Sequence, residues 1–248
     1  MKSHVLTINM ILIQNIVSDR YMKISVALLL VSIFFSSCFK DSDQQEYSSV
    51  IVSAITVINA SPDTPPLDFV LDNQRVQQFS YPDGKINYFA AFSGTRSARL
   101  FESGQPDQPL YTFDIRLLQG KYYSLFINGT KENLGALLIE DDLKSPGKEY
   151  AKVRFVNLSP DAPALDFGIS GDSVLASQKR FKEYTGFQEV KAGNYSALIK
   201  SSNGDAINFP FDLQIKPGKI YTVWAKGLIE SPAEGEEFGF SLLDHNID

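Results

Sequence analysis

One segment of this sequence occurs twice, and that duplication limits the folds that the chain can adopt. Residues 57–69 recur 98 positions later as residues 155–167, and both copies contain Asn-x-Ser-Pro-Asp-x-Pro-x-Leu-Asp-Phe, which we call the signature. Three shorter matches keep the same spacing: Phe113-Asp114 with Phe211-Asp212, Gly120-Lys121 with Gly218-Lys219, and Gly129 with Gly227. A fixed spacing indicates two copies of one structural unit of about 95 residues. We predict repeat 1 at 51–143, a linker at 144–150 and repeat 2 at 151–248.

Both repeats have the residue pattern of β-structure. Short runs rich in β-branched and aromatic residues alternate with turn pairs such as Asn203-Gly204 and Pro217-Gly218. The runs are Ile55–Asn59, Leu67–Leu71, Tyr111–Leu117, Tyr122–Asn128, Val153–Asn157, Leu165–Ile169, Tyr195–Lys200, Ile207–Ile215 and Ile220–Lys226. Beyond the N-terminal region no helical periodicity of useful length occurs. About seven or eight short strands per repeat predict an all-β protein of two tandem Ig-like or transthyretin-like β-sandwich domains.

The N-terminal region has the layout of an export signal. Met22-Lys23 precedes an apolar run, Ile24–Phe35, and two serines then precede Cys38. The run is too short for a helix that spans about 30 Å of hydrocarbon. A buried cysteine at the end of a core helix is the alternative, but no amphipathic period supports it.

Residues 35–38 resemble the lipobox of a bacterial lipoprotein signal. That resemblance implies that Cys38 receives a diacylglyceryl group and anchors the chain in the outer membrane. We then expect residues 1–21 to precede the true start, residues 22–37 to be the signal peptide and residues 38–50 to form a flexible tether. Lys40 followed by acidic residues resembles the signal that exports Bacteroidetes lipoproteins to the cell surface.

Composition excludes several classes of function. A single cysteine rules out an internal disulfide and a cysteine-based zinc site. The formal charge of −6 has the wrong sign for a nucleic-acid partner. Two histidines, His4 and His245, leave little material for histidine-based catalysis. We predict neither a cofactor nor an enzyme. A hydrolase acting on polysaccharide or peptidoglycan through two carboxylates stays open as an alternative, because acidic residues are abundant.

The repeated aspartates have two interpretations. Their signature residues are Ser61, Pro62, Asp63 and Asp68 in repeat 1, and Ser159, Pro160, Asp161 and Asp166 in repeat 2. We favour turn chemistry, in which proline fixes φ, Asp63 and Asp161 accept from backbone N–H groups two residues on, and Asp68 and Asp166 satisfy a neighbouring loop. The alternative is a Ca²⁺ site built from carboxylates five residues apart. We predict no metal site.

Some aromatic residues fall in expected loops or edges. Tyr81, Tyr88, Phe89, Tyr184 and Phe187 could stack on sugar rings. We favour a packing role, because Tyr88 and Tyr184 occupy nearly equivalent places in the two repeats, where a shared contribution to the core is expected.

The signature resembles that of the domain of unknown function 4397 family over residues 52–244. Members typically occur in tandem in secreted and lipid-anchored bacterial proteins, which implies an extracytoplasmic β-domain and transfers no activity or site residue. We expect a lipid-anchored, non-catalytic binding or adhesion module whose partner is a glycan or another envelope protein. A structural spacer is a further alternative.

Overall fold

The computed structural model describes residues 51–245 except 83, 172, 205 and 231. Cys38, the expected signal peptide at 22–37, the residues before it and the tether at 38–50 lie outside the described residues. Residues 50–248 form one compact unit. No helix in the described part of the chain is long and apolar enough to cross a membrane.

The described residues contain sixteen strands, eight in each repeat. Those of repeat 1 are β1 (Val52–Asn59), β2 (Leu67–Leu71), β3 (Gln74–Phe79), β4 (Lys85–Phe92), β5 (Gly94–Glu102), β6 (Tyr111–Leu117), β7 (Tyr122–Thr130) and β8 (Asn133–Asp141). Those of repeat 2 are β9 (Tyr150–Asn157), β10 (Leu165–Ile169), β11 (Ser173–Lys179), β12 (Gln188–Lys191), β13 (Gly193–Ser201), β14 (Asn208–Ile215), β15 (Ile220–Lys226) and β16 (Gly239–Asp244).

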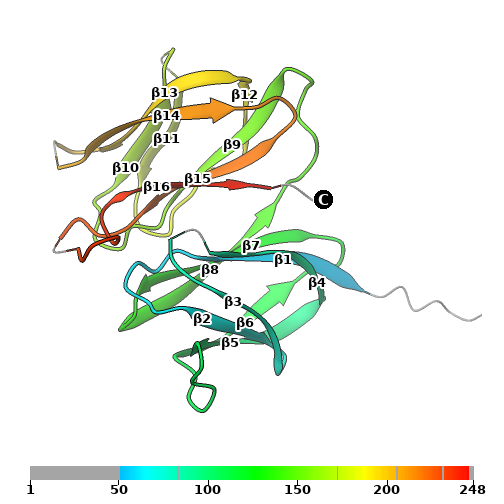
Figure 1. The fold of residues 1–248 in the computed structure, drawn as a ribbon. Coiled ribbons are helices and arrows are strands. Elements are labelled where there is room, and N and C mark those ends of the chain that lie inside the picture. Colours follow the sequence, from blue (N-terminus) through cyan, green and yellow to red (C-terminus); the bar gives the residue numbers. More distant parts are fainter. Residues whose placement is uncertain (1–50, 83, 172, 205, 231, 246–248) are drawn as a thin grey trace, which may run out of the picture. The chain divides into compact units, whose positions relative to one another are not determined.

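The strands form four sheets, two per repeat (Figure 1). Repeat 1 has the strand orders β4-β1-β7-β8 and β3-β2-β5-β6, and repeat 2 has the same orders in β12-β9-β15-β16 and β11-β10-β13-β14. Among these pairs, β1–β7 and β9–β15 are parallel and the others are antiparallel. The all-β sandwich prediction is therefore confirmed.

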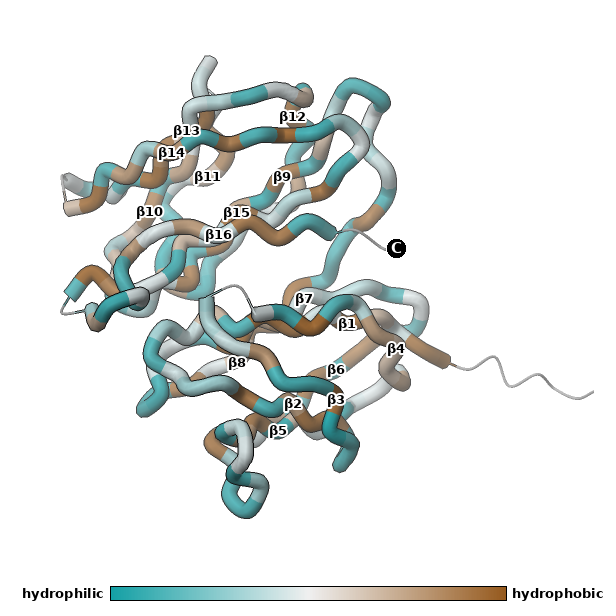
Figure 2. Tube along the Cα trace, viewed as in Figure 1, coloured by the Kyte–Doolittle hydropathy of each residue, from teal (hydrophilic) through white to brown (hydrophobic). Residues whose placement is uncertain are grey.

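Each sandwich has its own hydrophobic core because apolar residues alternate along the strands. Figure 2 shows hydrophobic and hydrophilic residues interleaved along strands such as β14. In β1, Ile55 and Val57 are fully buried in the core of repeat 1. Phe69 and Phe167 from the signature are fully buried in the cores of repeat 1 and repeat 2. Burial of this kind contributes about 25 cal/mol per Å² of apolar surface.

A third apolar cluster joins the two repeats. The opposite face of β1 and β7 contributes Ile58 and Phe126, and β9 and β15 contribute Val156 and Trp224. The rings of Phe126 and Trp224 meet edge to face with centroids 5.8 Å apart. The sheets that contain β1 and β9 are therefore buried on both faces near this cluster, and β1, β7, β9 and β15 are buried over most of their length.

Asp63 and Asp161 of the signature bond distant hairpins, whereas Asn59 and Asn157 cap the signature turns, each accepting from the serine N–H two residues on. Asp63 Oδ1 accepts from Lys131 N at 2.7 Å, and Asp161 Oδ2 accepts from Ile229 N at 2.9 Å and from Glu230 N at 2.8 Å. The expectation that these aspartates accept from donors two residues on was wrong. Parallel pairing of β1 with β7, and of β9 with β15, brings the turn after the first strand beside the hairpin 68 residues later.

The signature serines act on the same hairpins and explain the repeated glycines. Ser61 Oγ donates to Gly129 O at 2.9 Å, and Ser159 Oγ donates to Gly227 O at 2.7 Å. Gly129 has φ of +88°, and a Cβ there would lie 2.3 Å from Asn133 O. A side chain at this position is therefore excluded both by the backbone conformation and by the neighbouring carbonyl.

Candidate binding site

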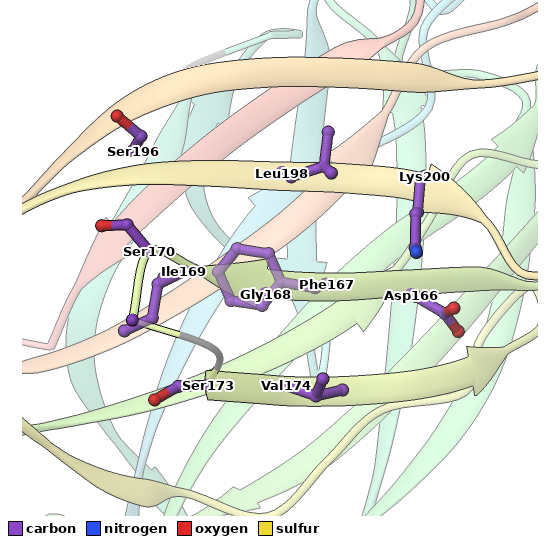
Figure 3. A pocket seen from close by; sticks show the side chains of 11 residues that line it. Asp166, Phe167, Gly168, Ile169, Ser170, Ser173, Val174, Ser196, Leu198 and Lys200 are labelled. Atoms are coloured by element: carbon purple, nitrogen blue, oxygen red, sulfur yellow. The ribbon is translucent and has the colours of Figure 1, made fainter.

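A shallow groove crosses the outer face of the sheet β11-β10-β13-β14 in repeat 2 (Figure 3). Its volume is about 330 Å³, within the range of small-ligand pockets. The side chains that shape it are Asp166, Val174, Ser196, Leu198 and Lys200, arranged around Gly168. Figure 3 shows Asp166 and Lys200 at one end and Ser170, Ser173 and Ser196 at the other.

The centre of the groove exists because Gly168 has no side chain. Gly168 pairs with Leu198 of β13 on one side and with Val174 of β11 on the other. Val174 is 68% exposed, the largest exposed fraction among the large apolar side chains described. A Cβ on Gly168 would lie 3.2 Å from Ser173 O, so a larger residue would occupy this space only if Ser173 shifted by a few tenths of an ångström. The groove thus has an apolar centre between polar ends.

Asp166 supplies a charged acceptor at one end. Its Oδ1 accepts from Ser202 Oγ at 2.7 Å, Gln178 N at 2.8 Å and Ser177 Oγ at 3.3 Å. Burial alone would raise the pKa of Asp166, but these hydrogen bonds and the charge of Lys200 lower it. An ionised carboxylate accepts hydrogen bonds from ligand hydroxyls, and it cannot act as the general acid that a glycosidase requires. Asp166 is the one carboxylate among the described residues that line the groove.

Repeat 1 has the same sheet with this face filled. Val70 stands at the position of Gly168, since it pairs with Arg99 on β5 and Arg75 on β3 as Gly168 pairs with Leu198 and Val174. Arg75 Nη2 lies 2.6 Å from Asp68 Oδ1, and the Arg99 guanidinium lies 5.6 Å from the centre of the Phe101 ring. Two arginines and a valine therefore occupy the space that is open in repeat 2.

The aromatic residues that could stack on sugar rings do not line this groove. Phe89 packs against the repeat 1 core, with its ring 6.5 Å from that of Phe69. Lys226 Nζ lies 5.5 Å from the centre of the Tyr81 ring, and Tyr184 is 44% exposed.

Strand register also corrects the proposed equivalence of Tyr88 and Tyr184. Phe89 pairs with Ile55 and Gln188 pairs with Val153, which places Phe187 at the position of Tyr88. Tyr184 instead takes the position of Lys85, because it bridges Val156 as Lys85 pairs with Ile58. Tyr88 and Phe187 are 99 residues apart, whereas Ile55 and Val153 are 98 apart, so repeat 2 has one additional residue between these positions.

Tyr88 and Phe187 belong to a buried polar network between the repeats. Arg154 of β9 and Asp141 of β8 form its ion pair, with Arg154 Nη2 2.7 Å from Asp141 Oδ1 and both side chains 1% exposed or less. The Arg154 guanidinium lies 4.5 Å from the centre of the Phe187 ring. The Phe187 ring in turn meets His245 edge to face, 5.5 Å away.

Hydrogen bonds in this network run toward the carboxylate. Arg154 Nε donates to Thr222 Oγ1 at 2.8 Å, which lies 2.6 Å from His245 Nε2. His245 Nδ1 lies 2.8 Å from Tyr88 Oη, which donates its proton to Asp141 Oδ2 at 2.6 Å. Since Tyr88 has one proton to give, its oxygen accepts from Nδ1–H, and Nε2 accepts from Thr222.

Burial decides the charge states of this network. Burial, then the positive charges of Arg154 and Lys85, lower the pKa of His245 well below its usual value, so the imidazole is neutral. Burial, then the charge of Asp141, raise the pKa of Tyr88. The network therefore fixes how the repeats pack and presents no group to a ligand. Within the described residues no set of three or more His, Cys, Asp or Glu side chains is arranged to hold a metal ion.

One family of known proteins matches part of this chain. Residues 53–168 match the family described as Domain of unknown function (DUF4397), from β1 through most of β10. This stretch includes both copies of the signature. No curated protein matches the sequence.

Solved structures resemble the fold distantly. A carbohydrate-binding module of family CBM26 from Eubacterium rectale Amy13K, solved with maltoheptaose, is 11% identical over 79% of this chain and 98% of its own, with a TM-score of 0.27. The Bacillus anthracis TIE protein is 14% identical over 71% and 34%, with a TM-score of 0.24. A Parabacteroides distasonis protein assigned to cell adhesion is 7% identical over 79% and 99%, with a TM-score of 0.23. At such scores nothing about a ligand follows from these similarities.

Proposed function

We propose that this protein is a non-catalytic binding module, anchored in the outer membrane through Cys38, that holds a glycan in the groove of repeat 2. The observation that carries the proposal is the difference between the two outer faces. The same sheet is filled by Val70, Arg75 and Arg99 in repeat 1 and is hollow around Gly168 in repeat 2. The fold therefore does not require the hollow.

The lining matches the chemistry of a sugar. One face of a pyranose ring presents C–H groups, which pack against aliphatic side chains such as Leu198 and Val174. Hydroxyl groups at the ring edge need acceptors and donors, and Asp166 and Lys200 provide both at one end. The serines at the other end supply further hydroxyls. A single ionised carboxylate among the described lining residues suits binding rather than glycoside hydrolysis.

Filling the groove tests this assignment. Gly168→Val places in repeat 2 the residue that repeat 1 carries at the same position, so we expect the fold to persist and glycan binding to fall at least about tenfold, the effect of losing about 1.4 kcal/mol. Binding would be screened on a glycan array and then measured by titration calorimetry with the oligosaccharide that binds best. Lys200→Met should also weaken binding, whereas Lys191→Met, at an exposed lysine outside the groove, serves as the matched control.

Two results would contradict the proposal. Unchanged binding by folded Gly168→Val would place the ligand elsewhere. Release of shortened glycan by the wild type would favour the hydrolase.

The anchor is tested separately by lipid labelling. Cells grown with labelled palmitate should label the wild type, and Cys38→Ser should abolish both the label and the processing of the precursor. Because a single acyl chain gives only marginal membrane binding, stable attachment requires at least the diacylglyceryl group. A label that persists in Cys38→Ser would overturn the anchor without touching the groove.

A further inference from the structure

Exposed apolar side chains gather at the end of repeat 1 where β1 begins. Ile51, Phe92 and Leu118 are 48%, 62% and 50% exposed, and we call these three side chains the apolar tip. Hydrogen bonds hold their three segments together: Ser93 N donates to Ile51 O at 2.9 Å, and Ser53 Oγ donates to Leu118 O at 2.8 Å. Large apolar side chains concentrated at one end of a domain mark a surface that meets another apolar phase.

Repeat 2 shows that the fold itself does not require an apolar tip. Equivalent strand register and backbone hydrogen bonds place Glu149 at the position of Ile51, Lys191 at that of Phe92 and Lys216 at that of Leu118, although Ala151 replaces Ser53. All three counterparts are charged and exposed. The same end of the same sandwich is therefore charged in one copy and apolar in the copy that follows the tether.

We infer that the apolar tip inserts into the surface of the lipid bilayer that holds Cys38. Thirteen peptide steps separate Cys38 from Ile51, so the tip lies at most about 43–47 Å from the anchor even when the chain is fully extended. The chain enters repeat 1 at the tip, which makes this end the one that the tether brings to the membrane. This inference rests on the proposed anchoring at Cys38 and is independent of the glycan groove.

The surroundings of the tip permit contact with a bilayer. Phe92 and Val52 line a hollow whose charged members include Asp72 and Arg96. Arg96 Nη1 lies 3.2 Å from Asp72 Oδ2, and Arg96 Nη2 donates to Ser93 O at 3.0 Å. The charges beside Phe92 are therefore paired within the protein. Insertion of the tip would add a second membrane contact to the lipid anchor and restrain the orientation of repeat 1.

An environment-sensitive label can locate the tip relative to the lipid. Cys38 is the only cysteine in the sequence, and lipidation would convert its sulfur to a thioether, so an introduced cysteine is the only free thiol. Phe92→Cys and Leu118→Cys would carry a nitrobenzoxadiazole label, with Val174→Cys as the control at a 68% exposed apolar position. The lipidated full-length variants would be reconstituted in phosphatidylethanolamine–phosphatidylglycerol vesicles, and circular dichroism would verify that each is folded.

We expect the emission at positions 92 and 118 to shift to the blue when vesicles are present and the emission at position 174 to stay unchanged. If vesicles change the emission at positions 92 and 118 no more than at position 174, with palmitate still attached to Cys38, the tip contact is overturned and the anchor stays intact. Loss of the palmitate label would overturn the anchor itself. A blue shift at position 92 that appears on concentrating the protein without vesicles would assign the tip to a second copy of this chain and also overturn the inference.

Discussion

The two repeats share strand order, register and signature, yet they differ at three surfaces. Repeat 2 has Gly168 where repeat 1 has Val70, and the groove lies on the outer face of repeat 2. Repeat 1 has an apolar end where repeat 2 has Glu149, Lys191 and Lys216. In a duplicated domain, residues that agree report what the fold requires, and residues that differ report what each copy has been free to change.

The contact between the repeats is the third difference. Thr56 pairs with Ser124 on β7, and at the equivalent place Arg154 pairs with Thr222 on β15. Asp141 ends β8, and His245 holds the corresponding position after β16, where its N–H bonds Ile220 O. One copy therefore supplies the anion and the other supplies the cation. Two copies of repeat 1 would bring two aspartates together, and two copies of repeat 2 would bring two arginines together. The charge pair therefore favours packing of repeat 1 against repeat 2 over packing of either repeat against a copy of itself.

Breaking the buried ion pair should have the largest effect. Arg154→Met leaves the carboxylate of Asp141 buried without its cation, which should lower the free energy of unfolding by about 3–5 kcal/mol. Asp141→Asn should cost a similar amount, and the double variant should lose less than the sum of the two because it removes both charges. Urea denaturation of the three variants measures the coupling.

An exposed ion pair within repeat 1 provides the control. Lys121 Nζ lies 2.6 Å from Glu140 Oε1, and both side chains are nearly half exposed. Lys121→Met should leave the unfolding midpoint unchanged, since solvent screens such pairs. If Arg154→Met cost no more than Lys121→Met, the pairing of the repeats would not depend on their opposite charges.

The sequence was informative where a rule acts over a few residues. The runs Leu67–Leu71, Tyr111–Leu117, Leu165–Ile169 and Ile220–Lys226 coincide with β2, β6, β10 and β15, because apolar and β-branched residues concentrate there. No predicted run covers seven of the strands, which are β3, β4, β5, β8, β11, β12 and β16. Among them, β3 and β11 are mostly polar and exposed at the edges of their sheets.

Neither the groove nor the buried polar network could be predicted from short sequence patterns. Asp141, Arg154 and His245 meet only after two sandwiches have packed, so no spacing announces the network. The groove arises from a side chain that is missing, Gly168, and it becomes visible only when strand register aligns that glycine with Val70. The internal repeat supplies this comparison only once the register of both copies is known.

Removal of the signature aspartates should lower the free energy of unfolding by a smaller amount, and by different amounts in the two repeats. Asp63→Ala removes an acceptor for one backbone N–H, and Asp161→Ala removes an acceptor for two. Each should lower the free energy of unfolding by about 0.5–2 kcal/mol, as for the loss of a capping side chain, with the larger loss at Asp161. Thermal unfolding would be measured in EDTA and in millimolar calcium. A calcium-dependent rise in Tm that disappears in the variants would favour the Ca²⁺ alternative, which we do not expect.

The smallest expected effect is a pH dependence that only repeat 2 can supply at the contact. His245 is the one histidine among the described residues, whereas repeat 1 carries Asp141 at the corresponding position. Its pKa is lowered in the folded protein, so below about pH 6.5 the unfolded chain binds the proton that the native state refuses. The stabilising contribution is complete above about pH 6.5 and declines as the pH falls toward the folded pKa, by about 1 kcal/mol between pH 6.5 and 5.5. In His245→Gln, which is neutral throughout, the decline caused by protonation of the imidazole should be absent, although loss of the imidazole contacts lowers stability at every pH.

Urea unfolding of the wild type and of His245→Gln at pH 7.5, 6.5 and 5.5 measures how steeply the stability of each protein depends on pH. Parallel pH profiles would mean that the imidazole is protonated equally in the folded and unfolded chains, contrary to its burial between Thr222 and Tyr88.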